Sequence, residues 1–151
     1  VQAFGYKAVD ALRLEKGYAA FPADVSAAET PYEARLGFCV NSDAGDFVGR
    51  QALLRKKSKG LNQRLHTLII GGDEYLSLHG GEAIIWKDKV ISRLRSAGYG
   101  HTVKKNIGYA YLPADLTIEK AHFEVEIFGE RISAEVAPDV LFDSEGKALK
   151  S

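Results

Sequence analysis

Residues 122–136 read HFEVEIFGERISAEV, and this stretch decides the fold class of the chain. Phe123, Val125 and Ile127 alternate with polar residues, which is the period of two expected of a strand with one buried face. The alternation resumes over residues 131–136, so we expect a turn at Gly129 and Glu130. The stretch therefore predicts a β-hairpin that buries one face in an apolar core.

The same short period extends back along the chain as far as Gly60. Short strands recur at spacings of roughly 8 to 15 residues, with glycine-containing turns between them, which is typical of a small antiparallel barrel or sandwich. The other predicted strands are Gln63–Ile70, Gly81–Trp86, Lys89–Leu94 and Ile107–Leu112, the second and third of which form a hairpin around Lys87 and Asp88. The half of the chain after Gly60 is therefore expected to be all β.

Before Gly60 the period lengthens to that of helices. An amphipathic helix is predicted from Phe4 to Lys16, with Gly17 as its C-terminal stop, and a basic helix from Gly49 to Lys59. The side of the first helix that is expected to face the core carries Phe4, Ala8, Ala11, Leu12 and Glu15.

Between the two helices the pattern predicts two short elements. Thr30, Pro31 and Glu33 have the spacing of a capping box with proline at the first helical position, which predicts a short helix. The apolar run Leu36–Val40 is expected to be a strand. The fold class predicted for the whole chain is α+β.

Composition limits the classes of function. The chain has 151 residues, 20 basic and 20 acidic side chains, and 46% hydrophobic residues. This hydrophobic fraction excludes wholesale disorder, and the zero net charge argues against a nucleic-acid partner. No apolar run approaches the roughly 20 residues needed to cross a bilayer, so no membrane partner is expected.

The ends and the cysteine content carry further expectations. A single cysteine, Cys39, forms no internal disulfide, which favours a reducing compartment: the cytoplasm or, in a eukaryote, the mitochondrial matrix. The sequence contains no methionine and opens on Val1, so we expect it to be a fragment of a longer protein.

Few side chains stand at the spacings that catalysis or metal binding requires. The four histidines include no i,i+4 pair and no cysteine partner at ligand spacing, so no metal site is predicted. Cys39 lies between apolar residues and is expected to be a buried, inert thiol. The basic residues of the helix at 49–59 are interpreted as a solvated face, with the binding of an anionic tail or partner as the alternative.

Several ordered motifs resemble the glycine-cleavage T-protein (aminomethyltransferase) family. The family's A-R-D-x-L-R-L-E-x-G, T-x-P-x-E-A-G-L and D-F-x-G-x-x-A-L motifs stand here at residues 8–17, 30–36 and 46–53. The SAGYGHTV stretch at 96–103, the AYLP strand at 110–113 and the LFD ending at 141–143 resemble the branch of sarcosine and dimethylglycine dehydrogenases. The resemblance covers nearly the whole chain.

The resemblance implies how the chain is organised. Residues 1–60 would be the C-terminal part of a ferredoxin-like, T-protein-like folate-binding domain that is truncated at its N-terminus. Residues 61–151 would be the aminomethyltransferase C-terminal β-barrel domain. Tetrahydrofolate is the implied cofactor, a small N-methyl amine the implied donor, and FAD would lie in an upstream domain that this chain does not contain. The remaining domains of the parent protein would be its partners.

Two positions are candidates for substrate binding. Phe38 falls where the family carries an aromatic residue that packs on the folate ring; the alternative is an ordinary core aromatic in a strand. Tyr99, in a glycine-flanked loop, could reach the folate opening, and the alternative is a turn tyrosine. The family's catalytic aspartate and its pterin-binding glutamate lie upstream of residue 8. No catalytic residue is therefore expected in this chain, and the chain alone is expected to be inactive.

Some positions depart from the family pattern. Val9 replaces the arginine of A-R-D, which together with the EKGY stretch at 15–18 favours the dehydrogenase branch. Arg35 replaces the glycine of E-A-G-L, with an undetermined effect on the edge of the pocket. Arg13 and Glu15 are interpreted as a structural polar pair rather than as ligands.

The preferred hypothesis is the tetrahydrofolate-binding C-terminal portion of a flavin-dependent sarcosine or dimethylglycine dehydrogenase, which couples oxidative N-demethylation to one-carbon transfer. The alternatives are a fragment of a stand-alone folate-dependent aminomethyltransferase or demethylase, and a non-catalytic binding module. Whether the parent protein is an enzyme depends on domains outside this chain.

Overall fold

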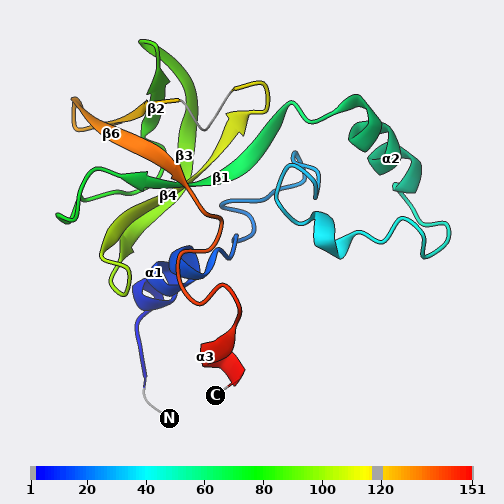
Figure 1. Cartoon of the computed structure of the whole chain (residues 1–151), viewed down its shortest axis with the longest axis horizontal. Coiled ribbons are helices and arrows are strands. Elements are labelled where there is room, and N and C mark those ends of the chain that lie inside the picture. Colours follow the sequence, from blue (N-terminus) through cyan, green and yellow to red (C-terminus); the bar gives the residue numbers. More distant parts are fainter. Residues whose placement is uncertain (1–2, 117–120, 151) are drawn as a thin grey trace.

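Antiparallel strands close into a barrel in the computed structural model, which describes residues 3–116 and 121–150 (Figure 1). Val1 lies outside the described residues. Around the barrel the strand order is β1-β4-β3-β2-β5-β6. The strands are β1 (Gln63–Ile70), β2 (Ala83–Trp86), β3 (Lys89–Gly100), β4 (Lys105–Pro113), β5 (Phe123–Ile127) and β6 (Glu130–Ala137). The helices are α1 (Tyr6–Lys16), η1 (Gly37–Cys39), α2 (Arg50–Lys59) and α3 (Lys147–Lys150). The predicted α+β class and the predicted barrel are confirmed.

The barrel interior is built by the alternation that the sequence shows. Phe123, Val125 and Ile127 of β5 point into the apolar core, and Leu68 and Ile70 of β1 meet them there. β4 differs from the other strands because both of its faces are buried. Its inward residues join the core, while its outward residues Ile107, Tyr109 and Tyr111 pack in a second cluster with Leu14 of α1 and Leu65 of β1.

The hairpin turns are confirmed in one case and shifted in the other. Lys87 and Asp88 have φ values of 49° and 59°, which is the backbone of the tight turn expected between β2 and β3. The second turn uses Phe128 and Gly129, with φ values of 49° and 85°, and Glu130 already begins β6. The predicted turn at Gly129 and Glu130 is thus wrong by one residue, because a bulky residue takes the left-handed position that sequence rules reserve for Gly, Asn and Asp.

α1 packs on β3 and β4 through a face that shares only part of the predicted one. Glu15 of the predicted face is buried together with Leu14, whereas Phe4 is 73% exposed and Leu12 is 56% exposed. The helix is anchored to the barrel by the polar side chains Arg13 and Glu15, described below, so the most apolar side is not the one that is buried. Among the described residues the longest helix has 11 residues, and none is a candidate membrane span.

Residues 30–40 contain the predicted capping contacts but neither of the predicted elements. Glu33 Oε2 accepts hydrogen bonds from the backbone N (3.0 Å) and Oγ1 (2.7 Å) of Thr30, yet residues 31–35 form turns instead of a helix. Arg35 has a left-handed φ of 63°, which reverses the chain and prevents an extended run after it. The predicted strand at 36–40 is therefore wrong: Gly37–Cys39 forms a 3-10 helix, and Cys39 is exposed instead of buried.

The basic helix α2 begins one residue after its predicted start and ends at its predicted last residue, Lys59. It follows Gly49 and precedes Gly60, and Leu53 and Leu54 on it are half-buried. α2 lies away from the barrel and is joined to it by the residues that lead into β1 (Figure 1).

Candidate functional site

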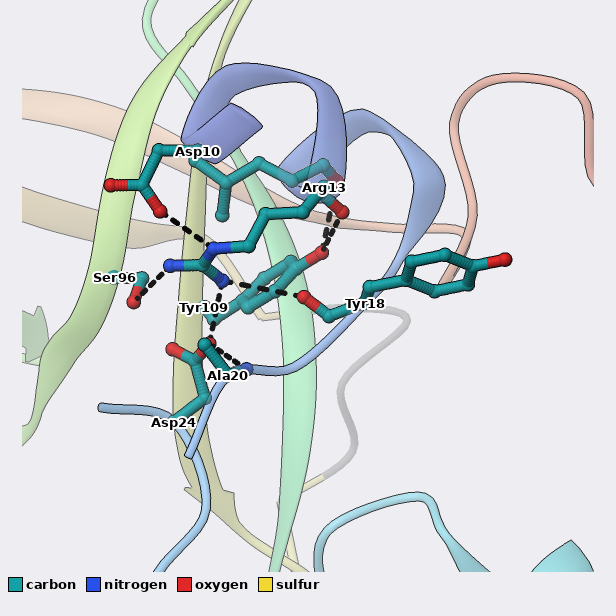
Figure 2. Close-up of polar contacts among 8 residues, drawn as sticks. Asp10, Arg13, Tyr18, Ala20, Asp24, Ser96 and Tyr109 are labelled. Atoms are coloured by element: carbon teal, nitrogen blue, oxygen red, sulfur yellow. Dashed lines mark hydrogen bonds and ion pairs between the residues drawn. The ribbon is translucent and has the colours of Figure 1, made fainter. Parts of the chain in front are cut away.

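A buried polar network ties α1 to the barrel and to the irregular segment that follows it, residues 18–36, which we call the strap. Figure 2 shows the Arg13 guanidinium among four partners. It donates to Asp10 Oδ1 (2.7 Å), to Asp24 Oδ2 of the strap (2.7 Å), to Ser96 Oγ of β3 (2.9 Å) and to the backbone oxygen of Tyr18 (3.3 Å). Asp24 has no solvent exposure, and Arg13 is the cation that pairs with its buried carboxylate.

Three further ion pairs fix the strap along its length. Glu29 pairs with Arg95 of β3 (2.5 Å), Glu33 with Lys56 of α2 (3.1 Å), and Arg35 with Asp139 after β6 (2.8 Å). In each pair the strap's own side chain is at most 8% exposed. Hydrogen bonds from Ser26 and the charge of Arg95 hold the pKa of Glu29 below its usual value. These ion pairs anchor the strap to β3, to α2 and to the segment after β6.

Close packing explains the glycines of two sequence motifs. Glu15 Oε1 accepts a hydrogen bond from the backbone N of Thr102 (2.7 Å) in the β3–β4 turn. A Cβ at Gly100 would lie 2.9 Å from Glu15 Cγ, and a Cβ at Gly17 would lie 2.6 Å from the backbone oxygen of Asp139. Both glycines are therefore required by close approach.

Arg13 and Glu15 are structural, as expected, but they are not a pair: each binds its own set of partners.

The buried tyrosines under α1 stay protonated at neutral pH. Tyr109 donates its hydroxyl to the backbone oxygen of Leu14 (2.9 Å), and burial raises its pKa to about 12. Burial also raises the pKa of Tyr111 to about 12. Neither phenol can therefore serve as a base near neutral pH.

Residues 3–116 and 121–150 contain no group of three or more His, Cys, Asp and Glu side chains placed to bind a metal.

Phe38 lies on η1 and is 85% exposed, so it does not pack in the core formed by the described residues. It borders a cavity of about 310 Å³, which we call the Phe38 cavity. Most of the lining is apolar or small, with two basic side chains: Lys16, Gly17, Tyr18, Ala19, Ala34, Arg35, Leu36, Phe38 and Val140. An exposed aromatic ring beside such a cavity can stack on a flat ligand.

Tyr99 lies elsewhere, on strand β3 rather than in the predicted loop. Its hydroxyl donates to the backbone oxygen of Asp73 (3.2 Å), and its ring meets Tyr75 and His101 edge-on at centroid distances of 5.7 and 5.2 Å. It borders a separate cavity of about 240 Å³ that Lys7, Asp10 and Leu14 of α1 also line. The structure does not bring Phe38 and Tyr99 into one cavity.

The sequence analysis did not predict that the side chains of Asp24 and Arg35 are buried. Asp24 lies in a segment without periodicity, and no sequence signal identifies it as buried. Arg35 gave a signal, because it stands at a position where the resembled motif has glycine, and the left-handed backbone there accounts for that preference.

Comparison with known proteins agrees with this architecture. Residues 63–143 match the family described as the glycine cleavage T-protein C-terminal barrel domain. The chain is 34% identical over 143 residues to dimethylglycine dehydrogenase of Rattus norvegicus, covering 94% of this chain and 17% of that protein. It is 36% identical over 114 residues to an aminomethyltransferase of Prochlorococcus marinus, covering 75% of this chain and 30% of that protein. The chain thus spans less than a third of either relative.

Among solved structures, the glycine cleavage system aminomethyltransferase T from Bartonella henselae superposes with a TM-score of 0.77 at 24% sequence identity. The match covers 87% of this chain and 38% of that one, and at this identity it shows the shared fold. Together with the barrel match, it places the fold within one family. The chain belongs to the glycine cleavage T-protein family and carries its C-terminal barrel domain.

Proposed function

We propose that the chain is the tetrahydrofolate-binding C-terminal portion of a flavin-dependent dehydrogenase that acts on sarcosine, dimethylglycine or a similar N-methyl amino acid. Similarity to dimethylglycine dehydrogenase over nearly the whole chain supports this branch. The aliphatic Val9 and the EKGY stretch at 15–18 point the same way. FAD would be bound by an upstream domain, and the parent protein would be the enzyme, located in the cytoplasm or in the mitochondrial matrix of a eukaryote.

The single observation that carries the folate assignment is the exposure of Phe38. A phenylalanine that is 85% exposed on a 3-10 helix does not stabilise a core, yet it stands beside an apolar cavity. The ring face would hold the flat heterocycle of folate, which supplies an acceptor for a one-carbon unit. Tyr99 is a second proposed contact, from its own cavity.

The domain boundary near Gly60 belongs to the same proposal. Residues 1–60 would complete the folate-binding domain, and residues 61–151 would form the barrel domain, which the family match from residue 63 supports. The exposed aromatic residues of the first half, including Phe4, Tyr6 and Phe21, would then contact the remaining domains of the parent protein.

The test uses the full-length protein and its Phe38→Ala variant. We expect flavin reduction by sarcosine or dimethylglycine at the wild-type rate in the variant, with one-carbon transfer to tetrahydrofolate requiring at least about tenfold more folate. An equal loss in both steps would show that Phe38 is structural. A full-length protein that turns over no one-carbon donor would instead make the chain a binding module.

A stand-alone aminomethyltransferase is the second candidate, favoured by the 36% identity to the Prochlorococcus protein. The mass and visible absorption spectrum of the native protein separate the two candidates. A large yellow protein supports the dehydrogenase, whereas a colourless protein of about half that size supports the transferase.

A further inference from the structure

A second cavity of about 310 Å³ lies next to the Phe38 cavity and collects positive charge. Its cationic side chains come from three elements: Arg35 from the strap, Lys57 from α2 and Arg64 from β1. Among the described residues no carboxylate lines it. The full lining is Tyr32, Arg35, Gly37, Lys57, Leu61 and Arg64. We call it the cationic cavity.

The charges around this cavity are not balanced by the protein. One carboxylate, that of Asp139, serves both guanidinium groups, at 2.8 Å from Arg35 and 3.4 Å from Arg64. Lys57 has its Nζ 5.9 Å from the Tyr32 ring centroid and belongs to none of the ion pairs found in the described part of the chain. Three cations against one carboxylate leave a surplus of two positive charges.

The carboxylate of Glu33, on the strap next to Tyr32, does not correct this surplus. It accepts hydrogen bonds from Thr30 and pairs with Lys56 at 3.1 Å. Those contacts hold the pKa of Glu33 below its usual value, so this carboxylate is already charged and paired elsewhere.

Arg35 is fixed in place and has an unused donor. Its Nη1 donates to Thr67 Oγ1 (3.0 Å) and Asp139 Oδ1 (2.8 Å), and its guanidinium lies 5.2 Å from the Tyr109 ring centroid. The side chain is 8% exposed, and within the described residues Nη2 is buried without a hydrogen-bond partner. A buried donor of this kind favours an acceptor, and a charged one most of all.

We propose that the cationic cavity binds an oxyanion ligand with two negative charges, either a phosphate group or a pair of carboxylates. The planar guanidinium groups of Arg35 and Arg64 suit such oxygens, and Lys57 adds a point charge. Gly37 permits the Tyr32 ring to lie close, since a Cβ there would meet Tyr32 Cδ1 at 3.1 Å. Arg35 lines both cavities, so one ligand could occupy Phe38 with its ring and the cationic cavity with an anionic tail.

The test titrates the full-length protein with inorganic phosphate and, separately, with glutarate at low ionic strength, using calorimetry. The variant is Lys57→Gln, and the matched control is Lys59→Gln, because both lysines are exposed on α2 and only Lys57 lines the cavity. We expect Lys57→Gln to weaken binding about tenfold, a factor equivalent to about 1.4 kcal/mol, and Lys59→Gln to leave it unchanged. Arg64→Gln is a second variant with the same expected direction.

The two probes distinguish the source of the charge. Binding of phosphate alone identifies a phosphate ligand, binding of glutarate alone identifies a dicarboxylate, and either result supports the site if Lys57→Gln weakens it. The absence of binding by both probes overturns the proposal, and so does an equal effect of Lys57→Gln and Lys59→Gln. The Phe38→Ala test is independent of these outcomes, so one proposal can fail without the other.

Discussion

The barrel and the strap are stabilised in opposite ways. In the barrel, the inward side chains of β1 and β5 are apolar and almost completely buried. In the strap, Ala34 is buried, but the other buried side chains are the charged ones of Asp24, Glu29, Glu33 and Arg35. The aromatic residue Phe21 of the strap is exposed, and so is Phe38, two residues after the strap ends. The barrel therefore buries mainly apolar side chains, and the strap buries mainly charged ones.

The difference indicates which region provides stability and which region fixes the position of a segment. Apolar burial is non-directional and gives the barrel a robust core. Buried ion pairs need their geometry and fix a segment in one position, and the strap leads directly into η1, which carries Phe38. We infer that the barrel supplies stability and that the strap fixes the position of the Phe38 ring, the proposed ligand contact.

The largest effect is expected in the barrel, where Phe123→Ala should lower the free energy of unfolding by about 3–5 kcal/mol. The reason is that Phe123 is 1% exposed and its removal leaves a cavity. Phe128→Ala, in the turn that follows the same strand and 85% exposed, should change the free energy of unfolding by less than about 0.5 kcal/mol. Denaturant unfolding measures both, and equal losses would contradict the assignment of the core.

The next largest effect is expected at the ion pair between Arg13 and Asp24 of the strap. Arg13→Ala should lower the free energy of unfolding by about 3 kcal/mol, because Asp24 would remain buried without its cationic partner. Adding Asp24→Ala should recover part of this loss, which a double-mutant cycle measures. Lys105→Ala removes the exposed ion pair with Asp73 and should have no measurable effect. If Arg13→Ala were as mild as Lys105→Ala, the strap would not depend on charge.

A smaller effect is expected from acid, through His66 on β1. Burial, aided by the charge of Arg64, lowers its pKa from 6.5 to about 4. Between pH 6.5 and 4 the His66 imidazole is protonated in the unfolded chain but stays neutral in the folded chain. The free energy of unfolding therefore falls as the pH falls through this range. Unfolding of wild type and His66→Gln at several pH values checks this, since the variant should lose less stability over that range. Parallel curves would show that His66 is not the group responsible.

The barrel was predictable, and the strap was not, for a physical reason. Alternation marks a strand that buries one face, so the bounds of β1 and the inward residues of β5 follow from the sequence. The face of α1 was predicted only in part: Glu15 is buried as predicted, but Phe4 and Leu12 are exposed because Arg13 and Glu15 anchor the helix. Ion pairs between residues far apart in the sequence leave no periodic signal.

The candidate site was predictable only in part. The motifs identified Phe38 as a residue of interest, but its exposure follows from the left-handed turn at Arg35, where the resembled pattern has glycine. The glycines at positions 98 and 100 belong to a stretch that the sequence analysis linked to function. The structure explains Gly100 by the close approach of Glu15. Tyr99 remains a proposed contact.

The most direct test is equilibrium binding of tetrahydrofolate to the full-length protein, with Phe38→Ala and Phe128→Ala compared side by side. Both residues are 85% exposed phenylalanines, one beside the Phe38 cavity and one on a barrel turn. Loss of a stacked ring should weaken binding by about 10- to 100-fold in Phe38→Ala and leave Phe128→Ala unchanged. Equal affinity in the two variants would contradict the assignment of the strap region as the ligand-binding part of the chain.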